Sequence, residues 1–155
     1  MKLIIQRVTK ASVTVDNKVI GSINNGYMIL VGFKIGDATQ QANKLTKKLL
    51  NLRIMPDEND QMNKSILDTK GEILLVPQFT LYADTKGRRP GFSHAMPPKD
   101  AEKLFNYFVK KVKESSLKIE TGIFGAMMDI SLINSGPVTI ILKENGFKPI
   151  QSKNN

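Results

Sequence analysis

The side chains that most often carry chemistry are scarce in this sequence. Its 155 residues include no cysteine and a single histidine, His94, in the segment GFSHAMPP. The lack of cysteine excludes disulfides, thiolate catalysis and cysteine-based metal sites, and one histidine alone cannot form a metal cluster. A Ser-His-Asp triad would require folding to bring His94 beside Ser93 or a distant serine. The simpler interpretation is a loop histidine with no catalytic duty.

Carboxylates and glycines reveal no familiar site either, but two segments resist a purely structural account. The 14 acidic residues show no metal-ligand spacing, and the 11 glycines form no phosphate-binding motif. The segment PQFTLYAD (77–84) clusters a Pro, a Gln and a Thr within an apolar strand pattern. The segment SGPVT (135–139) places Gly136 and Pro137 directly before an apolar run. Each could be a bulge or a turn, and the X-Pro bond could be cis, as about 5–6% of such bonds are.

The charge of the chain favours a polyanionic partner. There are 23 Lys and Arg residues against 14 Asp and Glu, a formal net charge of +9. Such an excess favours nucleic acid, because each neutralised phosphate releases a counterion. The alternative is a lysine-rich surface that serves solubility. No window approaches the ~18 apolar residues of a membrane span, and the first residues alternate in polarity, unlike a signal peptide. These features predict a cytoplasmic protein with no membrane association.

The elements that position these segments follow from hydrophobic periodicity. Strands are expected at 2–8, 11–16, 18–23, 27–33, 72–83 (interrupted at Pro77), 127–134 and 138–143, with an irregular stretch at 53–70. One helix should begin at a capping box of Asp37 and Gln40 and bury Ala42, Leu45, Leu49 and Leu52. A second should follow Pro97-Pro98 and bury Ala101, Leu104, Phe105, Phe108 and Val112. We predict an α+β fold with a mixed, mostly antiparallel, barrel-like sheet and two main helices, a single domain over 1–145 and a polar tail at 146–155.

Seven segments in this order resemble the D-aminoacyl-tRNA deacylase family. They are QRV (6–8), ASVTVDNKVIGSI (11–23), LNLRI (50–54), GEILLVPQFTLYAD (71–84), KGRRPGF (86–92), ETGIFGAMM (120–128) and NSGPVTIIL (134–142). The resemblance implies a homodimer with active sites at the subunit interface, where the Gly-Pro of one subunit enters the pocket of the other with its peptide bond in cis. It implies a tRNA substrate that carries a D-amino acid through an ester, hydrolysed to free amino acid and tRNA. It also implies hydrolysis of glycine mischarged onto alanine tRNA, without a metal or other cofactor.

The resemblance also assigns roles to residues. The catalytic motif matches Gln78, Phe79 and Thr80, whose main-chain N–H groups near Gln78 and Phe79 could stabilise an oxyanion. Thr80 is interpreted as a positioning hydroxyl first and a nucleophile second. The chiral filter and its surroundings match Gly136, Pro137, Val138, Thr139, Met127, Met128 and Arg7. The cations expected to contact tRNA phosphates are Lys86, Arg88 and Arg89. The alternatives without a functional role are a solvated turn for the three cations, a surface arginine for Arg7 and core packing for the two methionines.

Two departures from the family pattern bear on chiral specificity. Pro77 stands where Ser is usual, and Ser135 stands where Asp is more typical. A related editing branch also has Pro before Gln, and its trans Gly-Pro bond relaxes the filter. Retention of Phe79 favours the D-specific enzyme over that branch. A rival of another class is a non-catalytic RNA- or ribosome-binding β domain that uses the positive charge.

Overall fold

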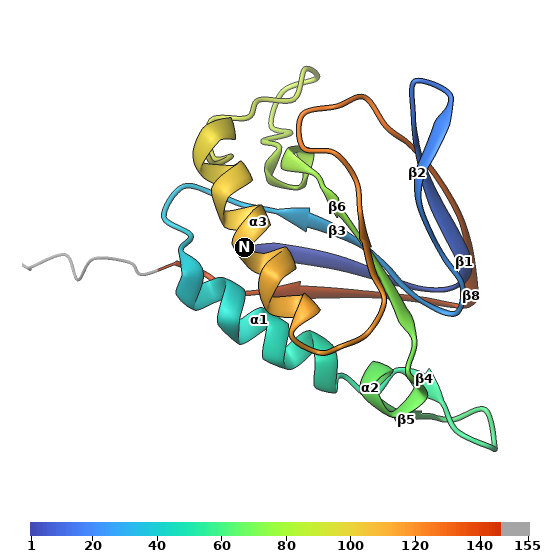
Figure 1. Ribbon diagram of the computed structural model, residues 1–155. Helices are drawn as coiled ribbons and strands as arrows, with labels where there is room; N and C mark the ends of the chain where they lie inside the picture. Colours follow the sequence, from blue (N-terminus) through green and yellow to red (C-terminus); the bar gives the residue numbers. More distant parts are fainter. Residues whose placement is uncertain (147–155) are drawn as a thin grey trace, which may run out of the picture.

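The computed structural model describes residues 1–146, so the predicted tail lies, apart from Gly146, outside the described residues. The elements follow one another as β1 (Lys2–Val15), β2 (Lys18–Ile23), β3 (Gly26–Gly32), α1 (Thr39–Asn51), β4 (Met55–Pro56), β5 (Met62–Lys64), α2 (Ile66–Thr69), β6 (Glu72–Pro77), the 3-10 turn η1 (Phe79–Tyr82), α3 (Pro98–Lys113), β7 (Ile119–Thr121) and β8 (Asp129–Lys143). The long helices α1 and α3 lie side by side on one face of the sheet (Figure 1).

The main sheet is mixed, with strand order β2-β1-β3-β6-β7 and with β8 paired to β1. Strand β1 pairs antiparallel with β2, β3 and β8, whereas β3–β6 and β6–β7 are parallel. The ends of the sheet approach each other, because β2 also contacts β6 and β7. The predicted α+β class, with a mixed, mostly antiparallel and barrel-like sheet, is therefore confirmed.

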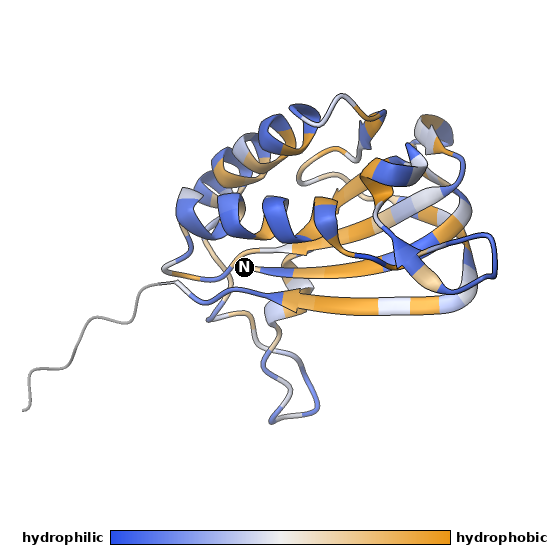
Figure 2. Ribbon diagram, turned by 90° about the horizontal axis from the view of Figure 1, so that it is seen from below, coloured by the Kyte–Doolittle hydropathy of each residue, from blue (hydrophilic) through white to orange (hydrophobic). Residues whose placement is uncertain are grey.

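Two apolar clusters cover the two faces of the central strands. The larger lies between the sheet and the helices and includes Ile29 of β3, Ile73 of β6 and Phe108 of α3. The smaller lies on the opposite face, where Met28 and Leu74 pack against the second half of β1. Helices α1 and α3 accordingly turn apolar sides toward the sheet and polar sides outward (Figure 2). Because β3 and β6 are buried on both faces, the strands themselves are closely packed up to their carboxyl ends.

Several strand boundaries differ from the sequence prediction. The stretches 2–8 and 11–16 form one strand, β1, and the stretches 127–134 and 138–143 form one strand, β8. Their pairing continues across register shifts on either side of Val8. A bulge interrupts the local residue pattern without ending the ladder, so a pattern that looks broken can belong to one strand. The predicted strand 72–83 is too long, because β6 ends at Pro77 and η1 follows.

The two long helices were predicted with different accuracy. Helix α3 buries Ala101, Leu104, Phe105, Phe108 and Val112, as expected. Helix α1 begins later than predicted: the Ala38 N–H donates to Oε1 of Gln41 at 2.8 Å, so Gln41 and not Gln40 completes the cap. It also ends earlier, at Asn51, so Leu52 follows the helix and is only partly buried.

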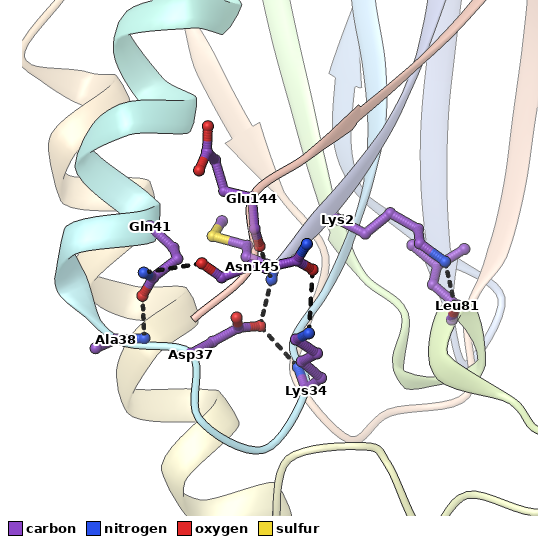
Figure 3. Close-up of polar contacts among 9 residues, drawn as sticks. Lys2, Lys34, Asp37, Ala38, Gln41, Leu81, Glu144 and Asn145 are labelled. Carbon is purple, nitrogen blue, oxygen red and sulfur yellow. Dashed lines mark hydrogen bonds and ion pairs between the residues drawn. The ribbon is translucent and has the colours of Figure 1, made fainter. Parts of the chain in front are cut away.

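The predicted capping residue Asp37 has another partner. It pairs with the buried α-amino group of Met1 at 2.5 Å, and its Oδ2 also accepts from the N–H of Lys34 (Figure 3). The stretch 53–70, predicted as irregular, contains the hairpin β4–β5 and the single turn α2. No helix within residues 1–146 has the length and apolar character needed to cross a bilayer.

Candidate active site

The turn that follows β6 presents free main-chain donors. We call residues 78–82 the signature turn. The Gln78 N–H donates to the carbonyl of Val31 at 2.8 Å, and the Leu81 N–H closes the turn on the carbonyl of Gln78. Within the described residues the N–H groups of Phe79 and Thr80 have no acceptor. The sequence analysis placed the donors near Gln78 and Phe79; the Gln78 N–H is occupied, so the free pair is Phe79 and Thr80.

Two side chains of the signature turn, those of Phe79 and Thr80, are exposed, whereas Tyr82 at its end is buried. Phe79 is 57% exposed and meets Phe92 edge to face, with ring centroids 4.9 Å apart. The Gln78 side-chain amide donates to the hydroxyl of Thr80. A hydroxyl that accepts this hydrogen bond is oriented by it, which suits the positioning role predicted for Thr80.

A basic loop lies shortly after the signature turn. Its ends are joined because Asp84 and Gly91 exchange two main-chain hydrogen bonds, of 2.7 and 2.8 Å. The predicted tRNA contacts, Lys86, Arg88 and Arg89, are exposed and form no ion pair within residues 1–146.

A shallow groove runs beside this loop. It is lined by Ala83, Asp84, Thr85, Lys86 and His94. The His94 carbonyl accepts from Ile35, while its exposed ring has no hydrogen-bond partner in the described part of the chain. His94 therefore lies in a loop and forms no triad with the residues of 1–146.

The segment with Gly136 and Pro137 forms a bulge in the β1–β8 ladder. Gln6 pairs with Thr139 and Val8 pairs with Asn134, so four residues of β8 lie opposite the single residue Arg7. We call residues 135–138 the Gly-Pro bulge. Gly136 has a φ of +125°, its bond to Pro137 is cis, and both residues are exposed. The sequence predicted two strands with these residues between them; the structure has one strand that projects them outward.

Two side chains hold the Gly-Pro bulge from its base. Arg7 donates from Nε to the carbonyl of Ser135 at 3.0 Å and from Nη1 to the carbonyl of Ile54 at 2.8 Å. Asn134 accepts from the Val138 N–H at 3.0 Å and donates to the Thr139 hydroxyl at 3.0 Å. Arg7 thus supports the bulge. From the sequence, an arginine on the surface with no such role was the alternative interpretation. Asn134 was missed, because one asparagine beside a Gly-Pro pair carries no signal of its own.

The two methionines predicted together are placed differently. Met127 is 92% exposed, on the loop between β7 and β8. Met128 is partly buried and packs against the cluster that contains Leu74 and Val76. It also lies against Gly122, where a Cβ atom would come within 2.6 Å of its Sδ. Met128 therefore contributes to core packing, and Met127 does not.

The signature turn and the Gly-Pro bulge do not meet within one chain. Pro77, the residue before the turn, lies in one row of the sheet with Val31, Leu3 and Leu142. The bulge lies opposite Arg7, several rows away and three strands across. With strands about 4.8 Å apart and a rise of about 3.4 Å per residue, the separation along the sheet is about 20 Å. The two motifs of one chain therefore lie too far apart to line the same pocket.

Comparisons with known proteins agree with the motifs. The family model described as D-Tyr-tRNA(Tyr) deacylase matches residues 4–143. The D-aminoacyl-tRNA deacylase of Aquifex aeolicus is 56% identical over 143 residues, which cover 92% of this chain and 97% of the relative. The chain therefore belongs to the D-Tyr-tRNA(Tyr) deacylase family, as the sequence motifs predicted.

Two solved structures are similar in fold. A structure named c-Myc DNA Unwinding Element Binding Protein superposes with a TM-score of 0.89 at 40% identity, covering 94% of this chain and all of that chain. A structure of a probable eukaryotic D-amino acid tRNA deacylase gives a TM-score of 0.80 at 17% identity, covering 91% of this chain and 97% of that chain. The second likeness concerns the fold alone.

Proposed function

We propose that this protein is an editing esterase that hydrolyses D-aminoacyl-tRNA to free D-amino acid and tRNA. Family membership and the name of the Aquifex relative support this activity. The observation that carries the proposal is the pair of unoccupied N–H groups at Phe79 and Thr80, at the start of a turn whose first N–H is bonded to β3 through Val31.

The reaction requires little from side chains. Water attacks the carbonyl carbon of the ester, and the negative charge that develops on the carbonyl oxygen is stabilised by the two main-chain donors, an effect worth roughly 10²–10³ in rate. The bond from this carbon to the ribose oxygen then breaks, and the ribose oxygen takes up a proton. Because an aminoacyl ester is already activated, the protein need not supply a strong nucleophile. The neighbouring ribose hydroxyl assists the proton transfer in place of a side-chain base. Thr80 positions the attacking water, its hydroxyl oriented by Gln78.

We further propose that the site is completed by a second copy of the chain. The Gly-Pro bulge is about 20 Å along the sheet from the signature turn of its own chain, so a pocket with both motifs needs two subunits. The bulge lies on β8, which carries two exposed apolar side chains, Ile133 at 50% and Ile141 at 63%. A partner that covered β8 would remove both side chains from water.

The bulge acts in this proposal as a filter for chirality. Main-chain carbonyls around Gly136 and Pro137 accept the ammonium group of the substrate in one orientation, and the side chain of an L-amino acid collides with them. Val138 and Thr139 close the filter, and Arg7 holds its base through the carbonyl of Ser135. Glycine has no side chain to exclude, so glycine mischarged onto alanine tRNA is also hydrolysed.

The positive charge serves the tRNA. Lys86, Arg88 and Arg89 project from the basic loop close in sequence to the signature turn, and their lack of internal ion pairs within residues 1–146 leaves them available to phosphates. Residues 1–145 act as one catalytic domain in the cytoplasm, where the substrate is found.

Incubation with D-tyrosyl-tRNA and L-tyrosyl-tRNA tests the proposal. The D-specific enzyme cleaves only the former, and it also cleaves glycyl-tRNA of the alanine acceptor. Cleavage of mischarged L-alanyl-tRNA would identify the relaxed editing branch to which Pro77 points. Binding of tRNA without any cleavage would favour a nucleic-acid-binding module, a class represented by the name of the similar c-Myc-element binding structure.

A further inference from the structure

Lys2 contacts the signature turn from a distant part of the sequence. It is the first residue of β1, and its Nζ donates to the carbonyl of Leu81 at 2.9 Å (Figure 3). The same ammonium lies over the ring of Tyr82, 4.8 Å from the centroid. Both contacts fall on the last two residues of η1. Lys2 thus binds the end of the turn opposite to the free N–H groups.

The carbonyl of Leu81 requires a partner from outside the turn. The carbonyls of Gln78 and Thr80 accept from the N–H groups of Leu81 and Ala83. The next N–H, that of Asp84, is directed to Gly91 instead. The last carbonyls of a helical turn carry a partial negative charge, and a cation stabilises them. Lys2 fills this role for Leu81.

The opposite end of the turn is fixed by the sheet. The Gln78 N–H donates to Val31, and the turn packs directly on Gly32, where an added Cβ would lie 2.9 Å from the Cβ of Leu81. Gly32 pairs with Lys2 in the β1–β3 register. The turn therefore has one main-chain anchor at its start and one side-chain anchor at its end, with Phe79 and Thr80 between them.

Lys2 is itself held in place by its surroundings. The preceding residue, Met1, is fully buried, and its ammonium pairs with Asp37 at 2.5 Å and donates to the Glu144 carbonyl at 2.7 Å (Figure 3). Burial lowers the pKa of Lys2, with a smaller contribution from the charge of Lys143. The ammonium is thus partly withdrawn from water and directed at the turn.

We propose that Lys2 is a positioning residue for the reaction: through the carbonyl of Leu81 it fixes the orientation of the signature turn and of its N–H groups at Phe79 and Thr80. The inference rests on the proposed function, because those N–H groups matter only if they bind the developing oxyanion. Lys2 contacts no reacting atom. Its effect is on the geometry of the donors, so it bears on turnover and not on substrate binding.

The test compares Lys2→Met, Lys2→Arg and the matched control Lys143→Met. Lys143 is exposed and is the residue of β8 that pairs with Lys2 of β1. Its substitution therefore removes one positive charge next to Lys2 but leaves the hydrogen bond between Lys2 and Leu81 in place. We expect Lys2→Met to lower kcat on D-tyrosyl-tRNA about tenfold with KM within about twofold, because an interaction made only in the transition state is weakened. Lys2→Arg, which can still donate to Leu81, should retain most of the turnover. Lys143→Met should behave as the unsubstituted protein.

Hydrogen exchange measured on the same variants separates the two proposals. Lys2→Met should accelerate exchange in the peptide that spans the signature turn, and Lys143→Met should not. Unchanged exchange and unchanged kcat in Lys2→Met would overturn the positioning role. A rise in KM together with a shallower salt dependence, at constant kcat, would also overturn it, because these changes indicate a phosphate contact. If the unsubstituted protein cleaves no D-aminoacyl-tRNA, the proposed function fails. Faster exchange in Lys2→Met would then show that Lys2 stabilises the turn without a role in catalysis.

Discussion

The signature turn and the Gly-Pro bulge are built in opposite ways. The turn follows β6, four of whose six residues are buried, and it packs on the main chain of a neighbouring strand. The bulge lies on β8, in which Leu142 is the one buried residue. The turn offers N–H groups, whereas the bulge offers an exposed main-chain segment held by the side chains of Arg7 and Asn134.

This difference explains how a site can work with few reactive side chains. Donors are best placed on a rigid support, because an oxyanion hole gains from fixed orientation. In the proposed dimer, the segment that enters the pocket of another subunit has to project from the surface, and it needs support only at its base. The two halves are therefore complementary, and the following substitutions test each half separately.

Gly136→Ala should have the largest effect and abolish turnover while leaving the protein folded. Gly136 has a φ of +125°, and a Cβ atom would lie 2.8 Å from both Arg7 Nη2 and Val138 Cγ2. The bulge must then move. Turnover of D-tyrosyl-tRNA, with size-exclusion chromatography as the folding check, gives the measurement. Gly36→Ala is the control, since Gly36 also has a positive φ, of +93°, but an added Cβ there would meet nothing within 4 Å. Wild-type activity in Gly136→Ala would refute the filter.

Phe79→Pro tests the donor half. Proline at the first position of the turn removes one N–H, and this position tolerates it. The ring is lost as well, so Phe79→Ala is the reference. We expect kcat of the proline variant to fall about 10²–10³-fold below that of the alanine variant. Equal rates for the two variants would mean that the Phe79 N–H does not contact the oxyanion.

Arg7→Lys tests the support of the bulge. Lysine keeps the charge but cannot reach the carbonyls of Ser135 and Ile54 together as the guanidinium does. One carbonyl loses its partner, so unfolding should become easier by about 1–2 kcal/mol. Urea denaturation measures this change. Hydrolysis of L-tyrosyl-tRNA should become detectable in the same variant, and unchanged selectivity would separate Arg7 from the filter.

The combined substitution Arg88→Ala and Arg89→Ala should have the smallest effect on chemistry. We expect KM for tRNA to rise with kcat unchanged, and the slope of log affinity against log salt to fall by about 0.9 for each phosphate that the loop no longer neutralises. Lys47→Ala with Lys48→Ala removes two exposed charges from α1 and serves as the control. An identical salt slope in both double variants would remove the basic loop from the tRNA interface.

Much of the fold follows from the sequence, because its strongest local patterns coincide with tertiary packing. Every residue of the predicted inner face of α3 is buried, and the apolar run 27–33 corresponds to β3, buried along most of its length. The errors arise where the local residue pattern predicts the end of a strand but pairing with a strand distant in sequence continues it. Lys10 and the Gly-Pro pair look like strand ends, yet pairing with β8 and β1 continues beyond them.

The sequence predicted which motifs form the candidate site, but it did not predict how their atoms are arranged. That the Gln78 N–H is used by Val31, leaving the N–H of Thr80 free instead, depends on the parallel pairing of β3 with β6. The role of Lys2 depends on a contact across 79 positions of sequence. Periodicity carries no information about such contacts, because they arise from how the strands are ordered in the sheet.

The position of the Gly-Pro bulge has a consequence for solubility. Within residues 1–146 no strand pairs with β8 on the side away from β1, so a row of main-chain groups is open to strand addition. Long, flat edges of this kind promote fibre-like aggregation, and natural proteins often blunt them with bulges. Residues 135–138 divide the 15-residue strand into two short stretches. The protrusion thereby discourages open-ended stacking of copies along this border of the sheet.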